Sequence, residues 1–234
     1  FGNLKFDVPI KPELLQLGAS WQANLRASGR LVVCAASTRM GEEQLILDAW
    51  QQVLKTARIQ PQPLLFIVPR HPERFDEVAK VILTSGFRLS RRSEAQEQPM
   101  IFDNIDVFLG DSMGEMSAYF SAANLVVMGG SFMPFGGQNL IEACAAGCPV
   151  LLGAHTYNFQ QASLDAIQAG AAKRIEGDLS LGDSIALMEA LKAFLLNPAE
   201  LSKMSDAAKT YSIEHQGATG RILAALDQKT FSLP

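Results

Sequence analysis

The 234-residue sequence lacks many of the features that mark whole classes of protein. Its three cysteines cannot form a fully paired set of disulfides, which favours a reducing compartment. Its uncharged apolar runs, such as Leu125–Met128, are far shorter than the ~20 residues that a membrane-spanning helix needs. It has 20 Lys and Arg against 24 Asp and Glu, a net charge of −4, which argues against nucleic acid as a partner.

Several motifs of ligand-binding proteins are missing as well. No Gly-x-Gly-x-x-Gly follows the first predicted strand, and the sequence contains neither a Gly-x-x-x-x-Gly-Lys-Ser/Thr loop nor a His-Glu-x-x-His zinc motif. Asp-x-Asp is absent, which argues against a metal–diphosphate clamp, and we expect no metal ion and no cofactor. Cys144 and Cys148 lie four residues apart without a histidine or second cysteine pair nearby, so we interpret them as small buried residues.

What the sequence does contain is a regular alternation of short apolar runs and amphipathic stretches. The apolar runs predict strands over residues 31–36, 63–68, 87–90, 105–109, 125–128, 149–152 and 171–175. Helical spacing of apolar residues predicts helices over residues 41–58, 75–82, 113–122, 139–146, 158–169, 185–195, 201–215 and 221–226. The pattern predicts an α/β fold, a Rossmann-like parallel sheet with helices on both faces and a helical C-terminal tail.

Ligands of such open sheets bind at the carboxyl ends of the strands, so the loops that follow the strands are the candidates. Pro69 and Arg70 come directly after the second predicted strand, where a guanidinium can hold a phosphate or a carboxylate. The alternative is that Arg70 is a surface residue paired with Glu73 or Asp76.

The loop after the fourth predicted strand has the residues of a helix start. Asp111 or Ser112 is expected to cap the helix, and Glu115 stands where a capping box returns its hydrogen bond. The free N–H groups of Met113, Gly114 and Glu115 then face the ligand edge, where helix-end geometry favours an anion. A plain helix cap explains all of these residues except the glycine.

The segment Gly129–Glu142 has two glycine pairs around an apolar loop, followed by a predicted helix start. That helix start suits a phosphate, and Glu142 can accept hydrogen bonds from neighbouring sugar hydroxyls. Phe132, Met133 and Phe135 are interpreted either as a flap over a bound group or as plugs in the core.

A fourth turn, Ser37–Glu43, brings hydroxyl groups and Arg39 to the same edge. Four loops that combine predicted helix starts, arginine and glutamate favour a nucleotide-sugar site over a redox site. No residue stands in the usual place for reading an adenosine ribose hydroxyl.

Six segments in this order resemble one known family, and together they run from Gly2 to Phe159. They are GNLKFD at 2–7, STRMGEE at 37–43, PRHPERF at 69–75, GDSMGE at 110–115, GGS with GGQNLIEA across 129–143, and HTYNF at 155–159. The chain is similar here to the C-terminal half of the 3-deoxy-D-manno-octulosonic acid (Kdo) transferases of lipopolysaccharide synthesis.

The resemblance implies that residues 1–234 form the single donor-binding domain of a GT-B glycosyltransferase, with CMP-Kdo as donor. By motif matching, CMP is held by Pro69, Arg70, Met113, Gly114, Glu115, Asn139, Leu140, Ile141 and Glu142. It also implies transfer to the lipid A precursor without a metal, at the cytoplasmic face of the bacterial inner membrane. The sequence starts at Phe1, so we expect a soluble, inactive piece whose acceptor site and catalytic base lie in a missing N-terminal domain.

Two positions depart from the family, which commonly has histidine where this chain has Arg39 and Gln138. The rival interpretations are another GT-B domain that uses a UDP-sugar, and a non-catalytic α/β interaction domain. Three further arginines, Arg88, Arg91 and Arg92, form a basic cluster that is either solvated or in contact with an anionic membrane surface.

Overall fold

The computed structural model describes residues 11–94, 102–176, 184–215 and 217. The seven strands are β1 (Val32–Thr38), β2 (Leu64–Pro69), β3 (Leu89–Arg91), β4 (Val107–Leu109), β5 (Leu125–Met128), β6 (Val150–Leu152) and β7 (Ala172–Arg174). The α-helices are α1 (Pro12–Ser28), α2 (Glu42–Ala57), α3 (Phe75–Thr84), α4 (Met116–Ala122), α5 (Ile141–Ala145), α6 (Gln160–Gln168), α7 (Ile185–Leu195) and α8 (Pro198–His215). Short 3-10 turns are η2 (Pro72–Arg74), η3 (Arg92–Glu94) and η4 (Tyr157–Phe159).

The strands form one parallel sheet in the order β3-β4-β2-β1-β5-β6-β7. The central strand β1 pairs with β2 on one side and β5 on the other, so the chain winds outward in both directions from it. Every residue of β2, β4, β5 and β6 is buried, as continuous apolar runs predict. The predicted parallel α/β sheet is confirmed.

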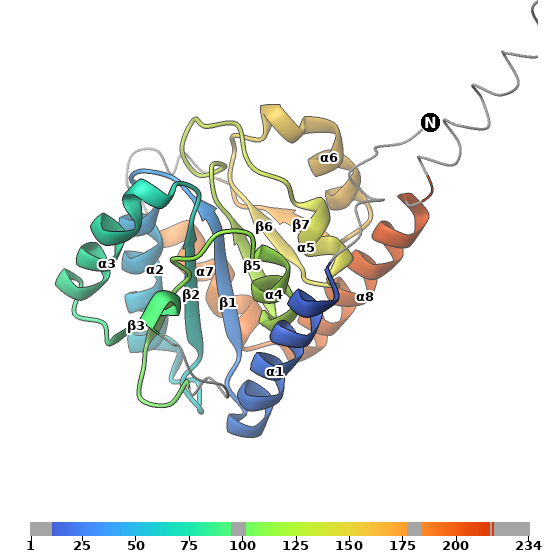
Figure 1. Ribbon diagram of the computed structural model, residues 1–234. Coiled ribbons are helices and arrows are strands. Elements are labelled where there is room, and N and C mark those ends of the chain that lie inside the picture. Colours follow the sequence, from blue (N-terminus) through green and yellow to red (C-terminus); the bar gives the residue numbers. More distant parts are fainter. Residues whose placement is uncertain (1–10, 95–101, 177–183, 216, 218–234) are drawn as a thin grey trace, which may run out of the picture.

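Helices cover both faces of the sheet (Figure 1). One face packs on α1, α4 and α5, and its core includes an aromatic group in which Trp21 lies 5.1–6.4 Å from the rings of Phe66, Phe102, Phe108 and Tyr119. The opposite face packs on α2, α3 and α7 around the fully buried Trp50. Helix α8 contributes side chains to both cores.

Some parts of the sequence prediction differ from the structure, and others fall on residues that the structure does not describe. Helix α1 was not predicted, although Pro12 at its start and Gly29 just beyond its end, with φ of +69°, are ordinary boundary signals. Strand β3 begins two residues later than predicted. The predicted helix at 221–226 and the segment 2–7 lie outside the described residues.

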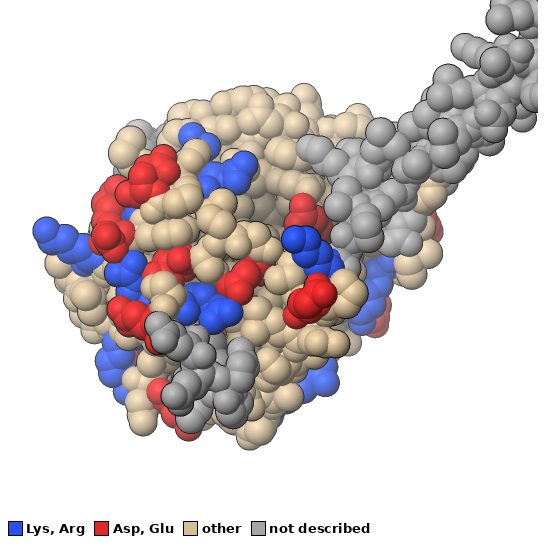
Figure 2. Space-filling model, in the orientation of Figure 1, with Lys and Arg blue, Asp and Glu red and all other residues tan. Residues whose placement is uncertain are grey.

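On the face seen in Figure 2, positive and negative side chains lie side by side, and the region over α6 is nearly uncharged. Within the described ranges, no helix is long and apolar enough to cross a membrane.

Candidate functional site

A pocket of about 450 Å³ lies at the carboxyl ends of the central strands, where the fold predicts a ligand. Its walls come from the carboxyl ends of β1 and β2, from the loops after β2, β4 and β5, and from residues of α4, α5 and η4. The lining residues are Ser37, Val68, Pro69, Arg70, Ser112, Met113, Gly114, Glu115, Met116, Phe120, Gln138, Asn139, Glu142 and Phe159.

Seven of the nine predicted CMP-binding residues line this pocket: Pro69, Arg70, Met113, Gly114, Glu115, Asn139 and Glu142. The other two, Leu140 and Ile141, are buried in the core with 0% and 1% of their surface exposed. Sequence reasoning did not include Met116, Phe120 and Phe159, which make part of the lining apolar. The four-residue spacing of Met116 and Phe120 on one helix was the available signal.

The prediction that Asp111 or Ser112 caps the helix after β4 is wrong. Gly114 has a φ of +78°, which no residue of a right-handed helix adopts, so α4 starts only at Met116. The Asp111 carboxylate instead accepts hydrogen bonds from Ser93 N–H at 2.8 Å and Arg91 Nε at 2.7 Å. The pocket edge is therefore a loop braced by charged side chains and not a helix N-terminus.

Glu115 does not complete a capping box either. Its carboxylate takes two hydrogen bonds from Arg92, Nε to Oε2 at 2.9 Å and Nη2 to Oε1 at 2.8 Å, and a further one from the Ser112 hydroxyl. The Arg92 guanidinium lies 5.6 Å from the Trp21 ring centroid. This wall of the pocket is thus connected through Arg92 to the aromatic core.

The same turn contains a pattern that the sequence prediction overlooked. Residues Gly110–Gly114 match the Gly-x-Ser-x-Gly of nucleophile elbows, which places a serine between a strand and a helix. The Ser112 hydroxyl contacts Glu115 and, at 3.3 Å, the Tyr119 hydroxyl. Neither partner is a histidine, so the described geometry does not activate Ser112 as a nucleophile.

Arg70 projects from the end of β2 into the pocket lining. Neither of the acids that the alternative interpretation assigned to it is its partner, because Glu73 lies 3.7 Å from His71 and Asp76 lies 2.8 Å from Arg91. Within the described part of the chain, the Arg70 side chain has no hydrogen bond or ion pair, and its N–H donates to Thr38 O at 3.0 Å. Its guanidinium is available for an anion.

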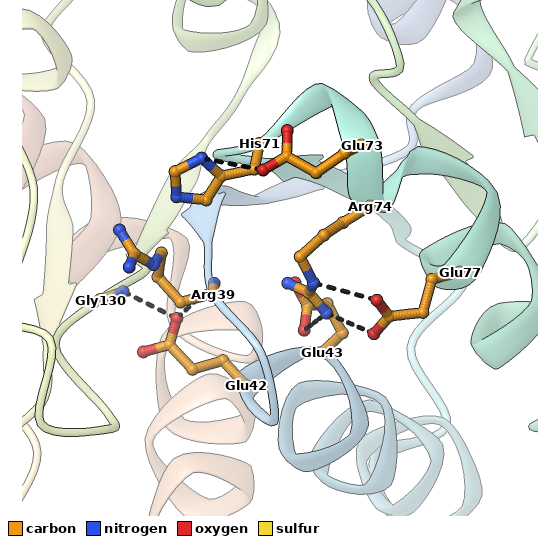
Figure 3. A network of polar contacts seen from close by, with 8 residues as sticks. All are labelled: Arg39, Glu42, Glu43, His71, Glu73, Arg74, Glu77 and Gly130. Atoms are coloured by element: carbon orange, nitrogen blue, oxygen red, sulfur yellow. Dashed lines mark hydrogen bonds and ion pairs between the residues drawn. The ribbon is translucent and has the colours of Figure 1, made fainter.

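The loop after β5 is held by one buried carboxylate from the start of α2. Glu42 is 0% exposed and accepts hydrogen bonds from the N–H groups of Arg39 (2.9 Å), Gly130 (2.7 Å), Phe132 (3.0 Å) and Met133 (3.3 Å). Burial raises the pKa of Glu42, and the four N–H bonds act in the opposite direction. Figure 3 shows this carboxylate beside Gly130, apart from the Arg74 pair with Glu43 and Glu77.

The Gly129–Glu142 segment behaves partly as expected. Phe132 is a core plug with 1% of its surface exposed. The predicted helix from 139 is only the five-residue α5, and Asn139 uses its side chain locally, donating to Glu142 Oε1 at 2.9 Å and accepting from Ile141 N–H at 3.2 Å. Glu142 reaches the pocket as a side chain held in place by Asn139.

The structure also places Arg39 and Gln138, which depart from the family pattern, and the three arginines of the basic cluster. Gln138 lines the pocket, and Arg39 lies with its guanidinium carbon 4.6 Å from the Phe135 ring centroid. The three clustered arginines each have an acidic partner: Arg88 with Asp106, Arg91 with Asp76 and Asp111, and Arg92 with Glu115. Their charges are neutralised within the chain.

The cysteines belong to the core. Cys34, Cys144 and Cys148 are free and buried, and burial raises the pKa of the Cys144 thiol to about 12. Within the residues described, no group of three or more His, Cys, Asp or Glu side chains is arranged to hold a metal ion.

Solved structures identify the class of this domain. The C-terminal CMP-Kdo binding domain of WaaA from Acinetobacter baumannii superposes with a TM-score of 0.71 at 28% identity, over 86% of this chain and 98% of that one. WaaG, a glycosyltransferase involved in lipopolysaccharide biosynthesis, superposes with a TM-score of 0.57 at 18% identity, over 84% of this chain and 47% of that one. The fold is the Rossmann-like domain of a GT-B glycosyltransferase.

Sequence relatives identify the family. The 3-deoxy-D-manno-octulosonic acid transferase of Bordetella pertussis is 43% identical over 226 residues, 97% of this chain and 50% of the relative. The Haemophilus influenzae transferase of the same name is 34% identical over 226 residues, 96% of this chain and 50% of that protein. No protein-family model matches the chain. The chain belongs to the Kdo transferase family and spans about half the length of the curated relatives it matches.

Proposed function

We propose that this chain is the donor-binding half of a Kdo transferase and that its pocket binds CMP-Kdo. The observation that carries the proposal is that one pocket gathers residues of three separate family motifs: Pro69–Arg70, Met113–Glu115, and Asn139 with Glu142. A volume of about 450 Å³ is in the range of small-molecule sites, ~300–1,000 Å³.

The lining supplies the contacts that a nucleotide monophosphate needs. In this proposal the unpaired Arg70 guanidinium binds the phosphate, and Glu142 accepts hydrogen bonds from ribose hydroxyls. Met116, Phe120 and Phe159 give the pyrimidine ring an apolar surface. These roles use side chains of the pocket and no metal ion, in keeping with the missing Asp-x-Asp.

The proposed reaction is a displacement at the anomeric carbon of Kdo. An acceptor hydroxyl of the lipid A precursor forms the new C–O bond while the bond to the CMP phosphate breaks, and CMP leaves with the bonding electrons. The hydroxyl proton passes to a base that we place in the other half of the full-length enzyme, at the cytoplasmic face of the inner membrane. Arg70 stabilises the negative charge that grows on the leaving phosphate.

Calorimetry with CMP and UDP tests the proposal on the 234-residue chain. We expect CMP to bind more tightly than UDP, and Arg70→Ala to weaken CMP binding by about 1.5–3 kcal/mol, the value of a charge-assisted hydrogen bond. Arg26→Ala, on the exposed surface of α1, is the matched control.

Equal binding of UDP would favour another nucleotide sugar, and no binding of either nucleotide would favour the non-catalytic interaction domain. An unchanged CMP affinity in Arg70→Ala would remove the phosphate role. The chain by itself is expected to transfer no Kdo, so measurable turnover would contradict the proposed division between two halves.

A further inference from the structure

Arg39 is a half-buried arginine at the ligand edge, and no acidic residue among those described is its partner. Its side chain makes neither a hydrogen bond nor an ion pair with any described residue. The nearby Glu42 carboxylate is occupied by four main-chain N–H groups, that of Arg39 included. Other arginines of this edge differ, because Arg74, Arg91 and Arg92 each contact a carboxylate at 2.7–2.8 Å.

Arg39 and Arg70 occupy neighbouring positions at the ends of paired strands. Thr38 of β1 is in register with Pro69 of β2, and Arg70 N–H donates to Thr38 O at 3.0 Å. The residues that follow this register pair are therefore close in space. Arg70 lines the pocket, whereas Arg39 stands just outside the lining, two residues after the lining residue Ser37. An anionic ligand that extends from the pocket past Ser37 would meet both positive charges.

Phe135 gives the Arg39 side chain a defined place. With its guanidinium carbon 4.6 Å from the ring centroid, the cation packs against the aromatic ring. Packing against a ring occupies one face of a guanidinium and leaves the N–H groups at its edge able to donate. In Figure 3 the Arg39 side chain extends away from the Glu42 carboxylate.

We infer that Arg39 binds the carboxylate of the donor sugar and selects acidic over neutral sugar nucleotides. The inference rests on the proposed function, in which the donor is CMP-Kdo. Kdo is an octulosonic acid, so its CMP conjugate carries a phosphate and a carboxylate, two anionic groups for two unpaired arginines. Arg70 takes the phosphate inside the pocket, and Arg39 takes the sugar acid at the rim, where a bidentate arginine–carboxylate pair can form.

The test compares CMP with CMP-Kdo by titration calorimetry on the 234-residue chain. Arg39→Met keeps an apolar stem on Phe135 and removes the charge. We expect it to weaken CMP-Kdo binding about 10- to 100-fold, as for a lost charge-assisted pair, and to leave CMP affinity within about twofold. Arg39→Lys keeps the charge without the bidentate fork, and its CMP-Kdo affinity should fall between wild type and Arg39→Met. Arg26→Met is the matched control and should change neither affinity.

Each other outcome overturns the inference. Equal losses for CMP and CMP-Kdo in Arg39→Met would place Arg39 on the nucleotide and leave the proposed function intact. Unchanged CMP-Kdo affinity in both variants would remove Arg39 from donor binding. A wild-type chain that binds neither ligand would overturn the proposed function together with this inference. If Arg39→Met does not fold, a wild-type affinity for CMP-Kdo in Arg39→Lys decides against a bidentate carboxylate contact.

Discussion

The two sides of the pocket are held in place by different kinds of contact. On the β4 side, three consecutive residues, Arg91, Arg92 and Ser93, bind the carboxylates of Asp111 and Glu115 in the pocket loop. These partners are about 20 residues apart in sequence, and the donors are two arginine side chains, the Ser93 hydroxyl and the Ser93 N–H. The loop is fixed because each carboxylate has several donors.

On the β5 side, a single carboxylate holds main-chain N–H groups. Glu42 binds Gly130, Phe132 and Met133, and no arginine is needed for this contact. Gly129 allows the chain to pass very close to β1, since an added Cβ would lie 2.4 Å from Ser37 O. The loop on this side is fixed by its backbone.

The difference leaves the arginines of the edge in two groups. Arg91 and Arg92 are occupied by carboxylates, so a ligand could recruit them only by breaking an ion pair. Arg39 and Arg70 have no such partner among the described residues. The Glu42 carboxylate binds main-chain N–H groups of the β5 loop, and the acids of the β4 loop bind Arg91 and Arg92. Structural support and the proposed ligand binding thus use different cations.

The largest effect is expected from breaking the β5 side with Glu42→Ala. Removing the carboxylate leaves buried N–H groups of Gly130 and Phe132 without an acceptor, which should lower the free energy of unfolding by about 3–5 kcal/mol. Urea unfolding of the 234-residue chain measures it.

Glu42→Gln should fall between Glu42→Ala and wild type, because one amide oxygen still accepts while its NH₂ group opposes the N–H donors. Glu13→Ala, in the exposed first turn of α1, should change stability by no more than about 0.5 kcal/mol. A Glu42→Ala chain within about 1 kcal/mol of wild type would show that the glycine-rich backbone holds the loop without this carboxylate.

A smaller effect is expected from breaking the β4 side with Arg92→Met. The side chains of Arg92 and Glu115 are 19% and 18% exposed, so loss of their two hydrogen bonds should cost about 2–3 kcal/mol of unfolding free energy. Because Glu115 lines the pocket, CMP affinity should fall as well, by several fold.

Arg88→Met is the matched control for this variant. Arg88 also pairs with an acid, Asp106, but its side chain is 58% exposed and neither residue lines the pocket. It should cost about 0.5 kcal/mol and leave CMP affinity unchanged. Equal losses of CMP affinity in the two variants would contradict a specific role of the Arg92–Glu115 pair at the pocket.

The strands and the position of the pocket could be predicted from the sequence, whereas helix α1 could not. The strands were predictable because continuous apolar runs as short as Leu64–Val68 are typical of buried strands and too short for most helices. The edge of the sheet that forms the pocket followed from strand direction alone. Helix α1 was missed because Gly18, Ala19 and Ser20 interrupt its weak apolar stripe. In the structure, α4 packs closely against α1 at Gly18.

The contacts that fix the loops were not predictable, because they join residues through tertiary structure. Nothing local shows that Arg91 meets Asp111, and a capping box was the simpler interpretation of that loop. The positive φ of Gly114 excludes a capping box, because it moves the start of α4 to Met116. Leu140 and Ile141 pack in the core, and the family motif that assigned them to CMP does not show which of its residues face inward.

The smallest expected effect concerns acid. Burial raises the pKa of Asp111, but hydrogen bonds from Ser93 and Arg91 outweigh burial, and the pKa in the folded chain lies below its usual value. The ionised carboxylate therefore stabilises the fold above the unfolded pKa of ~3.9, and this contribution is lost as pH falls through the lowered folded pKa. At pH 7, Asp111→Asn should cost about 1–2 kcal/mol, because its NH₂ group faces donors.

Urea unfolding at pH 7, 5 and 3 measures the difference in unfolding free energy between wild type and Asp111→Asn. We expect this difference to be the same at pH 7 and pH 5 and smaller at pH 3. Asp48→Asn, on the exposed face of α2, should show no such narrowing. A gap that stays constant down to pH 3 would mean that hydrogen-bond geometry, and not charge, holds the β4 side. In that event, neutralising Asp111 would remove little of the stability that its contact with Arg91 provides. Charge compensation would then not be what distinguishes Arg91 from Arg39 and Arg70, which have no acidic partner among the described residues.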